Sequence, residues 1–339
     1  MIINRYGKGG GGGGLGTFIY VTVEAGSVVT ATMGTTTRNG VYSQGVYVID
    51  IPALGDWVVT ATKGGKTASA TVTVDKAGMY EVTLSYISKT LNDVDWATIK
   101  EVADASEGAN YWAVGDCKQI TINGKLSDGL TLSNYQTWVY IIGFDHNSDR
   151  EGTGIAFQGF KTAQSNGTDI CLCDSGYNSH KSSGQWFNMN NNGLTNYGWN
   201  GCNMRNNTLP VVKAALPTDL QAVIKTTTLY TDNIGSALPT PSHVTATQDE
   251  LYLLAEFEIF GARTYANTAE QNYQKQYAYY VAGNSKVKHK HNSTTVAALW
   301  WERSVCTANT TCFCTVFTGG AAGNRTLDFS YGLASAFKV

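Results

Sequence analysis

Apolar and polar residues alternate regularly from Thr17 to about Tyr86, and this pattern limits the fold more than any other feature of the chain. A period of two places alternate side chains on opposite faces of a β-strand, so it predicts strands with one buried face. Turn signals at Arg38-Asn39-Gly40 and Lys63-Gly64-Gly65 separate the segments. The pattern is carried by FIYVTVEA, SVVTATMG, GVYVIDIP, DWVVTATKG, KTASATVTV and YEVTLSY.

Strands of this length and spacing are typical of an immunoglobulin-like β-sandwich. We predict such a module over residues 17–87, with Trp57, Val59, Ala61, Val72 and Val74 facing inward. It contains no recognisable site, and we interpret it as a spacer. Residues 1–16 are dominated by glycine and cannot bury enough surface to order themselves, so we expect a flexible joint there.

The composition suits a β-rich, loop-heavy extracellular or virion protein. The chain has 339 residues, 11% aromatic and 15% charged residues, and 37 glycines, a length that allows two domains with separate cores. A formal net charge of -2 gives no general attraction to nucleic acid. The sequence has no apolar run long enough for a transmembrane helix and does not start like a signal peptide, so we expect no secretion by that route.

Residues 88–339 show helical and strand patterns together. Apolar residues three and four apart predict helices after a cap at Asn92 or Asp93, over Asp219–Leu229 and over Gln248–Phe260. Helices among scattered short strands predict an α+β domain in which the chain end returns to the middle. The predicted strands cover residues 118–123, 136–143 and 154–160.

The cysteines and two polar segments are the candidate metal ligands. Seven cysteines are present, and in a protein assembled in a reducing cytosol they would be thiols, with Cys171 and Cys173 buried on one strand face and Cys312 and Cys314 on another. Residues 145–149 (DHNSD) lack the spacing of an EF-hand, so we interpret them as an Asx-rich turn. The lysine-rich segment around His289 and His291 has no third ligand, and we interpret it as an exposed strand. We therefore expect neither a metal nor a cofactor.

Motifs of common enzyme classes are absent from the sequence. It contains no nucleophile elbow, H-E-x-x-H, Walker loop or Rossmann fingerprint. We therefore expect a protein that is not an enzyme. Acidic residues from distant positions can still pair in a glycosidase, so a glycan-degrading enzyme stays as the third alternative.

The segment from Arg303 to Phe337 uses a restricted set of amino acids. It contains no Lys, Gln, Glu, Met or Trp, although all of these occur upstream. These residue types share one property, which is that none has a codon ending in a pyrimidine. They are therefore the types that cannot appear when the two adenines of an AAC or AAT codon are randomised. The segment follows Trp300-Trp301 and ends near an apolar terminus, as a variable cassette between fixed ends would.

The phrases WWERS, FCTV and YGLASAF resemble the C-terminal variable region of proteins that retroelements diversify in phages and bacteria. Members of that family have a C-type-lectin-like fold and display the varied side chains on a binding face, as the tropism determinant at a phage tail tip does. The resemblance implies a C-type-lectin-like domain over residues 88–339, with a variable region at about 302–337. Upstream phrases that resemble phage structural proteins of gut bacteria are GANYWAVGDCKQITING, YIIGFDHNS, GWNGCNMRNNTL, LLAEFEIFGARTYANTAEQNYQKQYAYY and GNSKVKHKH.

Compared with the family pattern, the variable region divides into fixed and varied positions. The fixed positions are matched by Phe313, Cys314, Val316, Gly320, Gly332, Ala334 and Phe337. The varied positions are matched by Cys312, Gly319, Ala321 and the residues that we assign to ligand binding, namely Cys306, Thr307, Asn309, Thr311, Thr315, Phe317, Asn324, Arg325, Thr326, Asp328, Phe329 and Tyr331. A strand over 313–317 would display Thr315 and Phe317 and bury Cys314 and Val316. The chain departs from the pattern at Glu302, where members have Leu, and at Val305 and Ser335, where they often have Pro.

The resemblance implies a phage receptor-binding protein, either a tail fibre or a tail-tip adhesin. Its partners would be a bacterial surface protein or glycan and other tail proteins, with a homotrimer as a candidate assembly and no nucleic acid. It would be assembled in the host cytoplasm and reside in the phage tail. Phe317, Arg325, Phe329 and Tyr331 would supply most of the binding energy, so we expect them exposed in one patch. The main alternative is a virion decoration protein whose cassette no longer varies.

Overall fold

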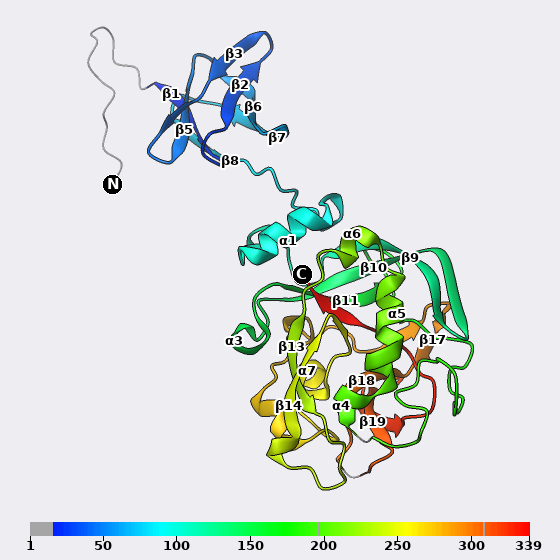
Figure 1. The fold of residues 1–339 in the computed structure, drawn as a ribbon. Coiled ribbons are helices and arrows are strands. Elements are labelled where there is room, and N and C mark those ends of the chain that lie inside the picture. The colour runs from blue at the N-terminus through cyan, green and yellow to red at the C-terminus, as the bar shows by residue number, and fades with distance from the viewer. Residues whose placement is uncertain (1–15, 196, 308) are drawn as a thin grey trace. The chain divides into compact units, whose positions relative to one another are not determined.

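The computed structural model describes residues 16–195, 197–307 and 309–339 (Figure 1). The described residues divide into two compact units, one that ends at Ser88 and one that begins at Lys89, close to the boundary expected between residues 87 and 88. The predicted glycine-rich joint lies outside the described residues except for Gly16. The structure is a mixture of α and β elements in which strands predominate. Within the described ranges, no helix has the length and apolar character needed to cross a membrane.

The first unit consists of two four-stranded sheets around one hydrophobic core. Their strand orders are β4-β5-β1-β8 and β3-β2-β6-β7. Trp57, Val59 and Ala61 are fully buried and Val74 nearly so, as predicted, whereas Val72 is only half-buried. The strands are β1 (Thr17–Thr22), β2 (Val28–Met33), β3 (Thr36–Asn39), β4 (Val41–Ser43), β5 (Val46–Ile51), β6 (Gly55–Lys63), β7 (Lys66–Val74) and β8 (Met79–Thr83).

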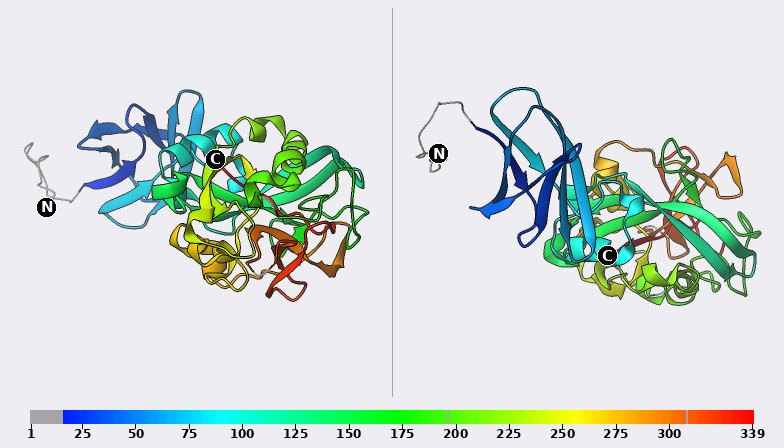
Figure 2. Two further views of the ribbon diagram at one scale, coloured as in Figure 1. Left: turned by 60° about the horizontal axis from the view of Figure 1, so that its bottom comes forward. Right: turned by 90° about the horizontal axis from the view of Figure 1, so that it is seen from above.

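A five-stranded sheet in the order β15-β21-β11-β10-β9 organises the second unit. The predicted strands at 118–123, 136–143 and 154–160 lie within β9 (Cys117–Ser127), β10 (Leu130–Phe144) and β11 (Ile155–Lys161). The hairpin of β9 and β10 runs through much of the length of this unit (Figure 2). The last strand, β21 (Ala336–Lys338), lies between β11 and β15 (Leu251–Tyr252), so the chain end is part of the central sheet.

The start of the second unit packs against its end. Helix α1 (Trp96–Asp104) buries Trp96, whose ring is edge-on to Phe157 of β11 and to Phe337 of β21 at centroid distances of 5.4 and 6.1 Å. Large aromatic side chains buried in this way contribute strongly to stability. The cassette therefore belongs to the core of this unit and does not form a separate tail.

The predicted helices of this unit are only partly present. The N-cap of α1 is Asp95, which accepts a hydrogen bond from the Thr98 N–H (2.8 Å), so the predicted cap at Asn92 or Asp93 is wrong. The helix predicted over 219–229 is limited to a short turn, because the threonine-rich end of that segment forms a strand paired with β14. The helix predicted over 248–260 is present only in its last five residues.

The remaining elements of the second unit are short and connect its small sheets. Two of these sheets have the orders β12-β16-β17 and β18-β19-β20, and β13 pairs with β14. The helices and turns are η1 (Leu91–Asp93), α2 (Gly108–Tyr111), α3 (Ser148–Glu151), α4 (Gly198–Gly201), the π-helical turn η2 (Met204–Thr208), α5 (Leu209–Ala214), α6 (Thr218–Gln221), η3 (Pro241–His243), α7 (Glu256–Phe260), η4 (Thr268–Asn272) and α8 (Ala278–Val281). The strands are β12 (Ile170–Cys171), β13 (Thr227–Asp232), β14 (Val244–Asp249), β16 (Lys288–Lys290), β17 (Ser293–Ala298), β18 (Trp300–Val305), β19 (Cys312–Val316) and β20 (Ala322–Thr326).

Candidate binding face

The variable region is built on the antiparallel sheet of β18, β19 and β20. Trp300 pairs with Val316 and Trp301 with Thr315, while β20 pairs with the other edge of β19. The residues that match fixed positions are in the interior, with the exception of the half-buried Gly320. Phe313, Cys314 and Val316 have no exposed surface, and Ala334 and Phe337 have almost none. This part of the cassette is therefore a structural core.

Eight residues assigned to ligand binding reach the surface. Asn309 and Thr326 are exposed, and the other six are half-buried, namely Thr307, Thr311, Phe317, Asn324, Arg325 and Phe329. They come from the turn before β19, from the residue after that strand, and from β20 and the loop that follows it. Residues separated by up to 22 positions in the sequence thus lie around one small sheet.

Phe317, Arg325, Tyr331 and Phe329 form a chain of side-chain contacts. The Arg325 guanidinium carbon lies 4.3 Å from the centroid of the Phe317 ring. Burial raises the pKa of Tyr331, and the positive charge of the nearby Arg325 partly offsets that rise. The rings of Tyr331 and Phe329 are nearly parallel, with centroids 6.1 Å apart. We call these four residues the aromatic patch.

Four residues assigned to ligand binding are buried, and the prediction that they are displayed is wrong. Thr315 has no exposed surface, because β19 is covered on both faces and does not alternate between solvent and core. Tyr331 is 4% exposed, because its ring is covered by Trp301 and Tyr177. Asp328 and Cys306 are also buried.

Cys306 is in a disulfide with Cys312, whereas the sequence predicted free thiols. Their Cα atoms are 5.6 Å apart and the Cys306 N–H donates to the Cys312 carbonyl, so the hairpin places the two side chains within bonding range. Cys314 and the pair Cys171 and Cys173 are buried free thiols, as predicted. The sulfur atoms of Cys171 and Cys173 are 3.8 Å apart.

Two residues beside the aromatic patch were not predicted from the sequence. The His180 ring lies edge-on to Phe329, and its Nε2 lies 2.7 Å from the Asp328 carboxylate. The Tyr177 hydroxyl accepts a hydrogen bond from the Leu299 N–H (2.9 Å). Both belong to the 177–181 segment, which lies more than 120 residues upstream of the cassette, and no local pattern in the sequence connects the two regions.

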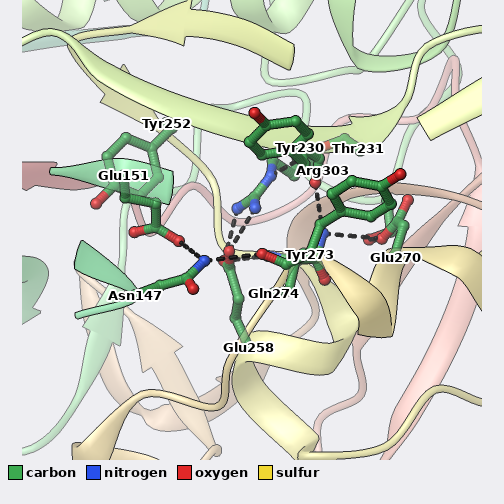
Figure 3. A network of polar contacts seen from close by, with 12 residues as sticks. Asn147, Glu151, Tyr230, Thr231, Tyr252, Glu258, Glu270, Tyr273, Gln274 and Arg303 are labelled. Atoms are coloured by element: carbon green, nitrogen blue, oxygen red, sulfur yellow. Dashed lines mark hydrogen bonds and ion pairs between the residues drawn. The ribbon is translucent and has the colours of Figure 1, made fainter. Parts of the chain in front are cut away.

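A buried polar network surrounds Arg303 of β18 (Figure 3). The Arg303 guanidinium donates to both carboxylate oxygens of Glu258, to Thr231 Oγ1 (2.8 Å) and to the Leu253 carbonyl (2.9 Å). The neighbouring Ser304 hydroxyl donates to Glu270 (2.6 Å). Because each of the three guanidinium nitrogens has an acceptor, the buried charge is compensated and β18 has one defined position.

Glu302 is the exception in this network. Its carboxylate is fully buried, and neither oxygen has a hydrogen-bond partner among the residues that the structure describes. Burial raises its pKa well above the ordinary value, and the nearby Glu256, Glu270 and Glu258 raise it further. Burial likewise raises the pKa of Glu270 to about 7. Burial thus disfavours the ionised form of Glu302, which occupies the position at which members of the family that the cassette resembles have leucine.

The other candidate ligand segments are occupied by internal contacts. Asp145 Oδ1 accepts a hydrogen bond from the Gly154 N–H (2.8 Å), and the His146 ring stacks on Tyr277 at a centroid distance of 3.6 Å. The prediction of an exposed strand at 288–290 is wrong for Lys288, which is buried and donates to the Tyr140 hydroxyl (2.7 Å), because β16 is the central strand of its sheet. Within the described ranges, no group of three or more His, Cys, Asp or Glu residues is arranged to hold a metal ion.

Comparison with known proteins gives one match. Residues 178–339 are similar to a family described as a domain of unknown function, DUF6273. The match covers slightly less than half of the chain, and it includes the entire variable region and His180. No curated protein and no solved structure matches the chain significantly. The function must therefore be argued from the residues themselves.

Proposed function

We propose that this protein is a phage receptor-binding protein of the tail fibre or tail tip, and that its cassette is a varied binding face. The observation that carries the proposal is the division between core and surface within the cassette. All residues that match fixed positions except the half-buried Gly320 are buried, whereas eight of the residues assigned to ligand binding lie at the surface. A protein that must tolerate many sequences at one face needs this division, because changes in a close-packed core are costly.

The proposed mechanism is recognition by exposed side chains on a rigid support. Phe317 and Phe329 offer apolar area, and Arg325 offers a charged group for hydrogen bonds. The support consists of the buried network around Arg303 and the disulfide between Cys306 and Cys312. Because this support does not depend on the exposed residues, different side chains can occupy the face without a change of fold.

The finer fold assignments belong to the same proposal. Two four-stranded sheets that share one core support an immunoglobulin-like sandwich for the first unit. In the second unit, a chain end that pairs within the central sheet, together with the packing of α1 on that end, supports a C-type-lectin-like domain. The first unit then serves as a spacer.

A virion decoration protein is the second candidate. It is favoured by Thr315, Asp328 and Tyr331, which match varied positions and yet are buried. A cassette that is still varied would have to accommodate changes at these three sites. A cassette that no longer varies would not.

The DNA around the gene distinguishes the two candidates. We expect a reverse-transcriptase gene nearby and a near-identical repeat of the cassette that differs at adenines in the codons of the surface residues. Sequences from sibling phages should then differ mainly at Thr307, Asn309, Phe317, Asn324 and Arg325. Uniform drift along the chain, without such a repeat, would favour the decoration protein.

A further inference from the structure

A cavity of about 510 Å³ lies beside helix α3 and the turn η4 in the second unit. Its lining is rich in side-chain amides and includes Asn147, Arg150 and Gln274. None of the lining residues belongs to the variable region at 302–337, so the cavity belongs to the framework. Side-chain amides both donate and accept hydrogen bonds, and such a lining suits a ligand with several hydroxyl groups.

The Arg150 guanidinium is held at the cavity in a fixed position. Its central carbon lies 4.7 Å from the ring centroid of Tyr273 and 5.6 Å from that of Tyr230, and the two rings stack on each other at 5.0 Å. One terminal nitrogen donates to the Asn272 carbonyl (3.3 Å). Within the described part of the chain, the other guanidinium N–H groups have no acceptor. An arginine fork of this kind suits a carboxylate, which accepts two parallel hydrogen bonds.

The buried Gln274 side chain lies at the same cavity. Its Nε2 donates to the Tyr230 carbonyl (2.7 Å) and to Glu270 (3.2 Å), which fixes the orientation of the amide (Figure 3). Its Oε1 has no donor among the described residues, although the side chain is 96% buried, with a relative exposure of 4%. The Gln274 amide is therefore a fixed part of the cavity wall, and a ligand in the open part of the cavity does not reach its Oε1.

The charges at the cavity favour a ligand with one negative charge. Arg150 and Lys275 are offset by the adjacent Asp149, which leaves one net positive charge. A phosphate monoester with two negative charges would be repelled by Asp149. We propose that this cavity binds a carboxylated saccharide of the uronic acid type, with the carboxylate on Arg150 and hydroxyl groups on the side-chain amides that line the cavity. This site is separate from the aromatic patch and would be the same in every cassette variant.

The test is calorimetric titration of the full chain with an acidic trimer, namely a galactose trimer in which one unit is galacturonic acid, with the neutral galactose trimer and with inorganic phosphate. We expect the acidic trimer to bind, and the neutral trimer and phosphate to bind at least roughly tenfold more weakly. Arg150→Ala should weaken the binding of the acidic trimer roughly tenfold. The melting temperature of this variant should not change, because Arg150 is exposed. The matched control is Arg325→Ala, which removes an arginine from the aromatic patch and should leave the affinity unchanged.

Several results would overturn the proposal. Equal affinity for the neutral trimer would remove the role of the carboxylate, and tighter binding of phosphate would contradict the charge argument. An unchanged affinity in Arg150→Ala, or binding of neither trimer, would show that the cavity is not this site. Loss of binding in Arg325→Ala alone would place the saccharide on the aromatic patch, which would contradict the cavity site while leaving the proposed adhesin function intact.

Discussion

Strands β18 and β20 flank the same central strand, and they differ in what surrounds their side chains. All six residues of β18 are buried, and they include Glu302, Arg303 and Ser304. In β20, Gly323 is buried, whereas Asn324 and Arg325 are half-buried and Thr326 is exposed. Each strand carries one arginine. Arg303 has four acceptors in the core, while Arg325 lies over the Phe317 ring at the surface.

In this cassette, residue type alone does not distinguish the supporting residues from the displayed residues. The support contains charged side chains, because the paired charges fix the position of β18. The display contains aromatic side chains, because the proposed function is recognition. The two strands should therefore respond in opposite ways to substitution, and the following experiments measure that difference.

The largest expected effect is that of Arg303→Met. The substitution leaves the Glu258 carboxylate buried without its partner, and we expect a loss of about 3 to 5 kcal/mol in the free energy of unfolding, measured by urea denaturation. The matched control, Arg325→Met, should cost less than about 1 kcal/mol, because its cation–π contact with Phe317 lies at the surface, where such contacts contribute little. Similar losses for the two variants would contradict the distinction between the strands.

The aromatic patch should itself divide into one supporting and one displayed ring. Tyr331 is buried against Trp301, so Tyr331→Ala should lower the free energy of unfolding by about 3 kcal/mol. Phe329→Ala should cost about 1 kcal/mol, because the ring is half-buried. Chemical denaturation of both variants measures the difference. A small loss in the free energy of unfolding for Tyr331→Ala would show that this side chain is displayed at the surface.

The first unit shows what could be predicted from sequence. Its strands were predicted because each buries one face, so that burial and the alternating pattern agree at Trp57, Val59 and Ala61. The helix predicted over 219–229 largely failed because β-branched threonines favour a strand at its end, where β13 pairs with β14. The helix predicted over 248–260 was shortened because its first residues belong to β14 and β15.

The site was predicted less well, for two physical reasons. Charged residues are usually at the surface, so Glu302 and Arg303 gave no sign that they are buried. The acidic residues inside the apolar run LLAEFEIF are the one available signal, since Glu258 and Glu256 are both buried. Thr315 and Tyr331 are buried by elements that lie far away in the sequence. The resemblance to a known family carried no information about this burial.

The disulfide should contribute a moderate amount to the support. Because it closes a short loop, chain-entropy arguments give a contribution of about 2 kcal/mol. Adding a reductant should therefore lower the free energy of unfolding of the parent protein by that amount. The double variant Cys306→Ser with Cys312→Ser should be insensitive to the reductant. A parent protein that is equally insensitive would show that the bond contributes nothing.

Glu302 should have a smaller effect on the free energy of unfolding, and this effect should depend on pH. Its folded-state pKa is raised above the ordinary value of 4.5, so the folded protein holds a proton that the unfolded chain releases. Stability should therefore fall as the pH rises above about 4.5. Glu302→Leu should raise the free energy of unfolding by about 1 kcal/mol at pH 8 and reduce this pH dependence.

A residual pH dependence should remain in Glu302→Leu. Glu270, with a pKa of about 7, also binds a proton more tightly in the folded state, and it acts between its ordinary pKa of 4.5 and 7. The control is Glu101→Gln on the exposed side of α1, which should leave the pH profile of the parent protein unchanged. An unchanged profile in Glu302→Leu would show that this carboxyl is ionised in the folded protein.

The most direct test of the account is the triple variant Phe317→Ala, Arg325→Ala and Phe329→Ala, studied for stability and for attachment together. Fluorescently labelled protein would be applied to a panel of intact gut bacteria, and its melting temperature would be measured in parallel. If these side chains form a display face, the melting temperature should change by no more than a few degrees, while attachment to the cells that the parent protein binds is lost. Retained attachment would contradict a displayed binding face. A loss of attachment accompanied by a large fall in melting temperature would contradict it as well.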